Sequence, residues 1–137
     1  MIIKFNIPNN PVAKGRPRFR KIGSFVQSYT PAKTKKAENY IVSCFKEQVK
    51  HFKTPIKGPI FVSIEFYMQI PTSLSKKKKN ELEGQFHIKK PDLDNLCKTV
   101  CDALNGVAWE DDSCVCSLVA IKRYANDPST VVTIESF

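Results

Sequence analysis

The chain of 137 residues is long enough for one domain with its own hydrophobic core. Its net charge of +9 arises in the first 60 residues, which hold 13 Lys and Arg against 2 acids, whereas residues 61–137 hold 9 against 11. No apolar run is long enough to span a bilayer, and five cysteines do not suit a disulfide framework, so we expect a cytoplasmic protein without a membrane partner.

The periodicity of apolar residues predicts the first elements in chain order. A first strand is expected to end at Pro8, and residues 9–23 are expected to form a loop. Thr30 precedes Pro31 as the capping residue of a helix, and a period of 3.6 residues carries this helix to about Val49.

The second half continues with a strand, a helix and two more strands. Residues 60–68 alternate between apolar and polar side chains, which predicts a strand in the centre of a sheet. Apolar residues recur at i, i+3, i+4, i+7, i+8 and i+11 from Leu93, which indicates an amphipathic helix closed by Asn105-Gly106. Further strands are expected at 115–124 and 130–137. The order predicts an α+β fold, a single domain spanning residues 1–137, with a mixed β-sheet and two main helices.

The loop predicted at residues 9–23 concentrates positive charge on backbone that cannot continue a helix. Since Arg and Lys on a mobile loop can contact phosphates, we predict that four of its residues bind DNA: Lys14, Arg16, Arg18 and Arg20. Phe19 lies among them, and we expect it in the core, with stacking on a base as the alternative.

Acidic residues gather around the predicted helix that starts near Leu93. This group consists of Asp92, Asp94, Asp102, Asp111 and Asp112, together with Lys98. The turn toward the next strand could return the last two acids to the helix start. Carboxylates this close repel one another unless a cation binds, which favours a divalent metal site beside a basic, phosphate-binding surface. The alternatives are helix capping by an aspartate and a surface ion pair between Asp94 and Lys98.

At these residues the chain resembles the RusA-like crossover junction endodeoxyribonucleases, or Holliday junction resolvases, of bacteria and their phages. The resemblance rests on three segments, which are residues 91–98, 102–106 and 109–113. Residues 7–19 and 29–31 also look like phage members of that family, so the resemblance covers nearly the whole chain.

The resemblance implies a homodimer that binds four-way DNA junctions and nicks two opposed strands, in recombination and repair. It implies that Mg²⁺, with Mn²⁺ as an alternative, is held by Asp92, Asp94 and Asp112, and that Lys98 is the catalytic lysine. Asp111 is the weaker candidate of its pair. The family has a basic run before the first aspartate, and we expect Lys89, Lys90 and then Asn95 to contact DNA, with helix capping as the alternative for Asn95.

Other functions are weighed against this one. A module that binds branched DNA without cutting it would gain nothing from the acidic group, and an RNA-processing nuclease could use the same metal centre. No glycine-rich phosphate loop follows a strand, so no nucleotide cofactor is expected. A zinc site would need four cysteines at unusual spacings, which are Cys97, Cys101, Cys114 and Cys116.

Overall fold

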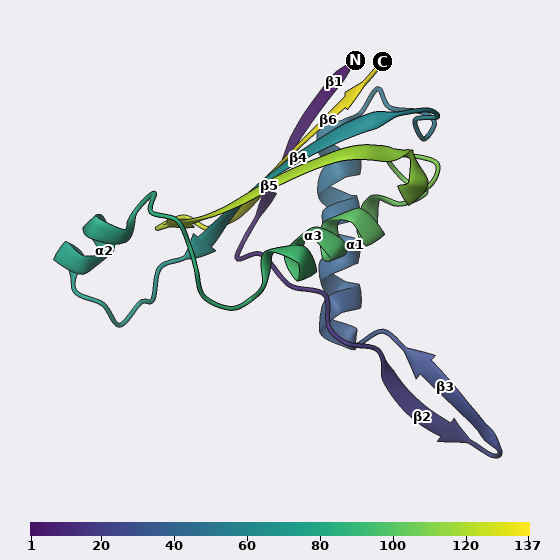
Figure 1. Ribbon diagram of the computed structural model, residues 1–137, viewed down its shortest axis with the longest axis horizontal. Helices are drawn as coiled ribbons and strands as arrows, with labels where there is room; N and C mark the ends of the chain where they lie inside the picture. Colours follow the sequence, from purple (N-terminus) through teal and green to yellow (C-terminus); the bar gives the residue numbers. More distant parts are fainter.

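The structure, a computed structural model, describes all 137 residues. A four-stranded sheet runs through the molecule in the order β1-β6-β4-β5 (Figure 1). The strands are β1 (Ile2–Pro8), β4 (Ile60–Gln69), β5 (Val115–Ala125) and β6 (Ser129–Ser136). Only β4 and β5 pair in parallel, and the other neighbours are antiparallel. The predicted mixed sheet is therefore confirmed.

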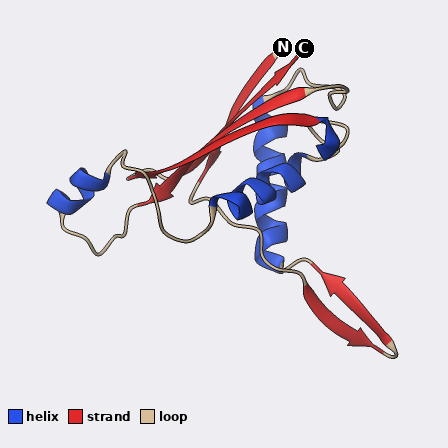
Figure 2. Cartoon of the chain, viewed as in Figure 1, coloured by secondary structure: helices blue, strands red, loops and turns tan.

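Two helices, α1 (Ala32–Gln48) and α3 (Leu93–Leu104), pack together on one face of this sheet (Figures 1 and 2). A shorter helix, α2 (Lys76–Leu82), lies away from them, and a single 3-10 turn, η1 (Asp112–Cys114), precedes β5. This arrangement confirms the α+β fold with two main helices. None of the helices is long and apolar enough to cross a membrane.

The core lies between the sheet and the two main helices. Alternation along β4 points one set of side chains toward the helices, and these are buried as predicted: Ile60, Val62, Ile64, Phe66 and Met68. The apolar stripes of α1 and α3 supply Phe45, Leu96 and Leu104 to the same cluster. Gly106 takes a left-handed conformation with φ of +75°, so α3 ends at the predicted cap.

The loop predicted at residues 9–23 is wrong over its second part. Arg18–Ile22 forms strand β2, which pairs antiparallel with β3 (Phe25–Tyr29) in a hairpin that projects beyond the start of α1 (Figure 1). All ten strand residues are exposed, so no buried face imposes the alternation by which strands are recognised. Phe19 is 69% exposed, which contradicts its expected place in the core.

The predicted cap of α1 is also wrong. The helix begins after Pro31, whose carbonyl accepts a hydrogen bond from Lys35 N, and no side chain caps it. Thr30 lies one residue too early for that role. The hydroxyl near this helix start that does bond backbone belongs to Thr34, which accepts from Gly15 N at 2.9 Å.

The segment between β1 and β2 is fastened to both main helices. Lys14 N donates to Asn95 O of α3 at 3.0 Å, and the next residue, Gly15, bonds Thr34 of α1. A Cβ on Gly15 would lie 2.7 Å from Thr34 Oγ1 and 3.1 Å from Pro31 Cγ. Only glycine therefore fits this junction, from which the hairpin projects.

Gly15→Ala should destabilise the protein because a methyl group must enter a space already filled by the buried hydroxyl of Thr34. We expect the free energy of unfolding to fall by about 1–3 kcal/mol, measured by urea denaturation with an unchanged m value. In a Thr34→Ala background the clashing atom is gone, so the same change should cost less. An equal cost in both backgrounds would contradict the steric explanation.

Candidate active site

Three of the predicted site residues line one open pocket between α3 and the strand β5. They are Asp94 and Lys98, both exposed on α3, and Asp112 at the start of η1. The pocket has a volume of about 770 Å³. Asp112 reaches it because the chain turns back after α3, as expected from the sequence. Asp102 lines the pocket as well, so three carboxylates and one ammonium group share one opening on the protein surface.

The carboxylate of Asp112 is held in place by the protein's only tryptophan. Trp109 is fully buried, and its Nε1 donates a hydrogen bond to Asp112 Oδ1 at 2.9 Å. The other oxygen, Oδ2, has no hydrogen-bond partner in the protein. A buried donor that fixes one oxygen and leaves the second free is the usual way in which metal-binding carboxylates are oriented. The sequence contained the signal, a lone Trp three residues before the acid, but not this contact.

The carboxylate of Asp94 is free. The alternative ion pair between Asp94 and Lys98 is not formed, since Lys98 Nζ lies 3.6 Å from Asp102 Oδ2 instead. Helix capping does not explain the acids here either. Asp92 occupies the N-cap position of α3 but makes no capping hydrogen bond. Asp94 oxygens are therefore available to a ligand in the pocket.

Asp92 lies outside this pocket. Its Oδ1 accepts a hydrogen bond from Lys90 Nζ at 2.9 Å, and both side chains are exposed. This hydrogen bond and the charge of Lys90 hold the pKa of Asp92 below its ordinary value. As a result, no three acidic, cysteine or histidine side chains converge closely enough in this structure to hold a metal ion. Asp94 and Asp112 are brought together, and the third expected ligand is not.

Two cysteines, Cys97 and Cys101, line the same pocket as the carboxylates. Burial, followed by the charge of Asp112, raises the pKa of Cys101 to about 12. Burial and then the charge of Asp94 also raise the pKa of Cys97. No three cysteine, histidine or acidic side chains lie close enough together to hold a metal ion, so the alternative zinc site is not supported. Carboxylate oxygens are the donors that Mg²⁺ and Mn²⁺ prefer, so Asp94 and Asp112 fit such an ion.

Asp111 has a structural task. Its Oδ2 accepts the backbone N–H of Ser113 at 2.9 Å, which caps η1. Hydrogen bonding to the side chain and then to the backbone of Ser113 lowers the pKa of the Asp111 carboxyl. Asp111 therefore positions the turn that carries Asp112, and its side chain is not among those that line the pocket.

A basic groove lies beside the predicted metal ligands. It has a volume of about 910 Å³ and is lined by several cationic residues, namely Lys14, Arg16, Arg18, Lys33 and Lys90. The uncapped N-terminus of α1 adjoins it, with no acid in its first turn. Cations at the positive end of a helix are unfavourable unless an anion neutralises them, so the groove suits a phosphate backbone. Lys33 was missed because it lies within a regular helical pattern.

The other predicted DNA contacts lie around this groove. Arg20 extends along the hairpin, where its Nε donates to Gln27 Oε1 at 3.1 Å. Lys89 is exposed, and its carbonyl accepts from Lys122 Nζ. Asn95 is exposed on the first turn of α3, and its side chain makes no hydrogen bond that would cap the helix.

Lys14 differs from the other predicted DNA contacts because it is largely buried. Its Nζ pairs with Glu38 of α1 and lies 3.1 Å from Asp102 Oδ2 of α3. Burial alone lowers the pKa of Lys14, but the hydrogen bonds that it donates to Glu38 and Asp102 outweigh this effect, so the pKa is raised. A DNA phosphate would have to compete with both acids for this lysine.

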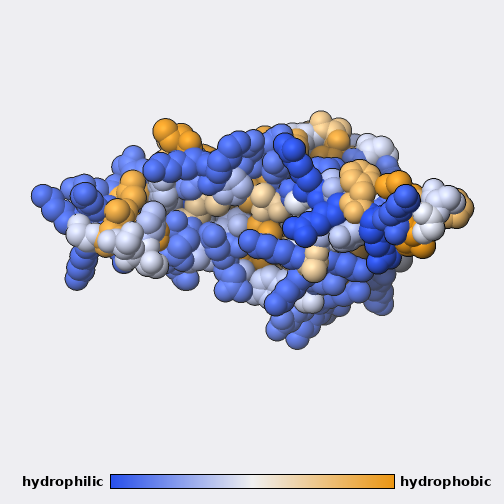
Figure 3. All heavy atoms as spheres, turned by 90° about the horizontal axis from the view of Figure 1, so that it is seen from below, coloured by the Kyte–Doolittle hydropathy of each residue, from blue (hydrophilic) through white to orange (hydrophobic).

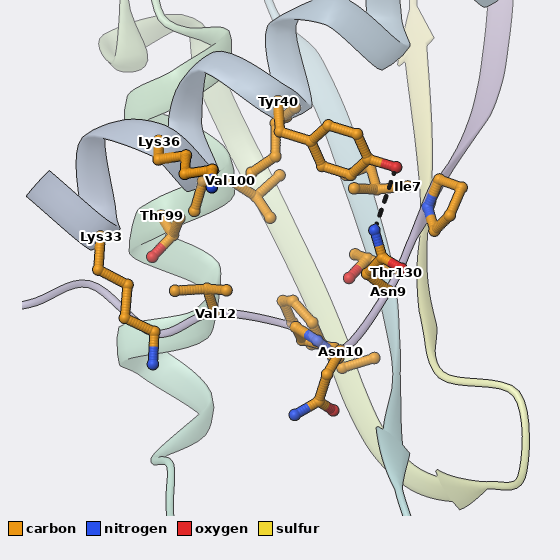
Figure 4. Close-up of a pocket in the computed structure, with 15 residues that line it drawn as sticks. Ile7, Asn9, Asn10, Val12, Lys33, Lys36, Tyr40, Thr99, Val100 and Thr130 are labelled. Carbon is orange, nitrogen blue, oxygen red and sulfur yellow. Dashed lines mark hydrogen bonds between the residues drawn. The ribbon is translucent and has the colours of Figure 1, made fainter.

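A separate cavity of about 410 Å³ lies between the N-terminal segment, α1 and α3 (Figure 4). Its walls are mainly apolar, and Asn9 Nδ2 donates to Tyr40 Oη across it at 3.4 Å. No acid lines this cavity, so it lacks the groups needed to hold a metal ion. The carboxylate pocket is the better candidate for chemistry.

Paired carboxylates and a lysine beside a cationic groove define a protein that acts on a nucleic acid backbone. Comparison with known proteins identifies the kind: the family described as "Endodeoxyribonuclease RusA" matches residues 8–135. The chain belongs to this family of endodeoxyribonucleases, which confirms the resemblance seen in the sequence and implies Holliday junction resolvase activity. It is also similar to "Uncharacterized protein YqaN" of Bacillus subtilis (strain 168), with 35% identity over 136 residues, covering 96% of this chain and 94% of that protein.

Trp109 offers a direct optical test of metal binding at the carboxylate pocket. Because this sole Trp bonds Asp112, Mg²⁺ or Mn²⁺ should change its fluorescence in a saturable titration without DNA. Asp112→Asn and Asp94→Asn should each weaken the apparent affinity by on the order of 10-fold or more. Asp111→Asn is the matched control and should bind as the wild type does. Equal titrations for all four proteins would place any bound metal elsewhere.

Proposed function

We propose that the protein is a metal-dependent, structure-selective endodeoxyribonuclease that resolves four-way junctions by paired nicks during DNA recombination and repair. Besides family membership, one structural observation supports this proposal. Asp94 and Lys98 of α3 and Asp112 of η1 line a single pocket, and the Lys14–Asp102 ion pair joins it to a cationic groove. This combination supports cleavage of a phosphodiester rather than binding alone.

In this proposal each residue of the pocket has a distinct role. Asp94 and Asp112 hold a divalent ion, Mg²⁺ or Mn²⁺, which supplies Lewis acidity toward the scissile phosphate when bound. Trp109 keeps Asp112 in one orientation, so little reorganisation is needed on binding. The Lys98 side chain is 60% exposed, so its ammonium group can contact a non-bridging phosphate oxygen. Its ion pair with Asp102 restricts the positions that this group takes.

Asp92 completes the ligand set when DNA arrives. Its present partner, Lys90, also lines the basic groove, so a phosphate placed there competes with Asp92 for the same ammonium group. Exposed ion pairs of this kind contribute little to stability and exchange readily. Binding of the substrate would therefore release Asp92 toward the metal. The site would be complete only with DNA in the groove.

The junction also constrains the quaternary structure. A four-way junction is two-fold symmetric, and two symmetric nicks are made most simply by a two-fold dimer with one active site in each subunit. We therefore propose a homodimer. The cationic groove of each subunit would bind one pair of the duplex arms of the junction.

Cleavage of a labelled four-way junction, compared with a linear duplex of the same sequence, tests the proposed function. We expect paired nicks in the junction with Mg²⁺ or Mn²⁺, and none with chelator. Asp94→Asn and Asp112→Asn should lower the rate by at least about 100-fold while junction binding is kept or strengthened, since each removes negative charge near DNA.

Asp111→Asn serves as the control in the same assay and should cut at close to the wild-type rate. Tight junction binding without cleavage by the wild type under any divalent ion would support a binding module instead. Preferential cleavage of a matched RNA junction would support an RNA-processing enzyme.

Lys90→Ala separates the two tasks given to this lysine. Without its partner Asp92 is free, so metal affinity measured by Trp109 fluorescence in the absence of DNA should rise. Junction affinity should fall, and the slope of log K against log salt should become shallower by about one phosphate contact. Lys89→Ala should change the salt slope but not the metal affinity. If Lys90→Ala leaves metal affinity unchanged, Asp92 is not held back by Lys90.

A further inference from the structure

We infer that the β2–β3 hairpin is an arm whose apolar tip inserts between bases at the branch point of DNA, while the arginines at its base hold phosphates. This inference rests on the proposed action on branched DNA and adds the element that would recognise the branch. The tip consists of Ile22, Phe25 and Val26, on either side of the turn at Gly23.

The tip is apolar although water surrounds it. Phe25 is 75% exposed, Val26 70% and Ile22 50%, and none of them joins the core cluster. Figure 3 shows apolar atoms at several places on this surface, including the right-hand end, at which the hairpin projects in Figure 1. A two-stranded hairpin with exposed apolar residues is of marginal stability alone, which indicates that a partner covers it.

The charge of the arm identifies that partner. Arg18, Arg20 and Lys21 lie on the hairpin, and no acid occurs in the chain before Glu38. The arm of a second copy would bring like charges together, whereas DNA supplies phosphates for the arginines and bases for the tip. Apolar wedges flanked by cationic side chains are a common means of unstacking a base step.

The pairing of the strands sorts these residues along the arm. Residues that are directly opposite each other in the two strands lie on the same face of the hairpin. From base to tip, one face carries three such pairs: Arg18 with Tyr29, Arg20 with Gln27, and Ile22 with Phe25. Arg20 bonds Gln27 and lies over the ring of Tyr29 at 5.7 Å, which stiffens the cationic part. One face of the arm thus presents positive charge first and an apolar pair at its end.

The arm is connected to the candidate active site through short contacts. Gly15 and Lys14 fasten its base to α1 and α3, and α3 carries Asp94 and Lys98. Arg16 and Arg18 line the same groove as Lys90, the partner of Asp92. A backbone that follows the groove from the arm would reach the carboxylates, so the tip would set the position of the cut relative to the branch.

The test uses the full-length protein and a junction with 2-aminopurine at the branch point, in chelator so that nothing is cut. Wild-type protein should raise the fluorescence of the analogue because insertion unstacks it. Ile22→Ala/Phe25→Ala should abolish the rise at saturating protein, whereas the conservative control Ile22→Val/Phe25→Leu should retain it. Arg18→Ala/Arg20→Ala should instead weaken binding and flatten its salt dependence, with the rise restored at saturation.

A second reporter covers the case in which the alanine variant loosens the hairpin. Phe25→Trp places a fluorophore at the tip, and junction binding should quench it by stacking, while a linear duplex should quench it less. With metal present, Ile22→Ala/Phe25→Ala should cut a fully paired junction at least tenfold more slowly than the wild type. The deficit should shrink to within about twofold when the branch point carries unpaired bases, because unstacking is then already done.

The results of these experiments distinguish a failure of the inference about the arm from a failure of the proposed nuclease function. If the wild type cuts no junction but the fluorescence results hold, the proposed function fails and the arm stands. If the wild type cuts the junction while 2-aminopurine and the tip Trp do not respond, the arm inference is overturned. Sedimentation in which Ile22→Ala/Phe25→Ala dissociates a dimer would also overturn it, since a second copy would then cover the tip.

Discussion

The ion pairs of Lys14 join the parts of this protein that matter for its activity. A lysine side chain that is 17% exposed must be paired, and its partners come from two different helices, Glu38 on α1 and Asp102 on α3. The same Asp102 limits the movement of Lys98, at 3.6 Å, so the position of the proposed catalytic lysine depends on the buried one. Since the backbone of Lys14 also bonds Asn95, the base of the hairpin is joined to both α1 and α3.

The division of charge along the chain becomes a division in space. The cationic first half supplies the hairpin, the start of α1 and most of the basic groove, whereas the acidic second half supplies the carboxylate pocket. Lys90 lies where the two regions meet, because it lines the groove and pairs with Asp92. A phosphate backbone is attracted by the first region and repelled by the second. A divalent ion in the pocket removes that repulsion, so metal and DNA would each favour the binding of the other.

The elements with a buried face were predicted from their periodicity, whereas strand β2, which has no buried face, was missed. Strand β4 and helix α3 follow their apolar periodicities because one side of each packs in the core. The hairpin has no buried side, so its strand at Arg18–Ile22 left no pattern to find. In the site, the family resemblance selected Asp94 and Asp112, and the turn after α3 does bring both to one pocket. The contact between Trp109 and Asp112, and the pairing of Lys14 away from solvent, depend on how separate segments pack, which spacing does not encode.

Two of the proposed metal ligands, Asp112 and Asp92, are held in different ways, and this difference suits a structure-selective enzyme. Asp112 is fixed by a buried indole and is ready before any substrate binds. Asp92 is held by an exposed lysine that belongs to the DNA groove. An enzyme whose ligands were all fixed in advance would cut any duplex that touched its pocket. In the proposed mechanism a backbone in the groove competes with Asp92 for Lys90, and DNA that follows the groove from the arm would compete most effectively. Selectivity for branched DNA would then arise in the assembly of the site itself, without any base being read.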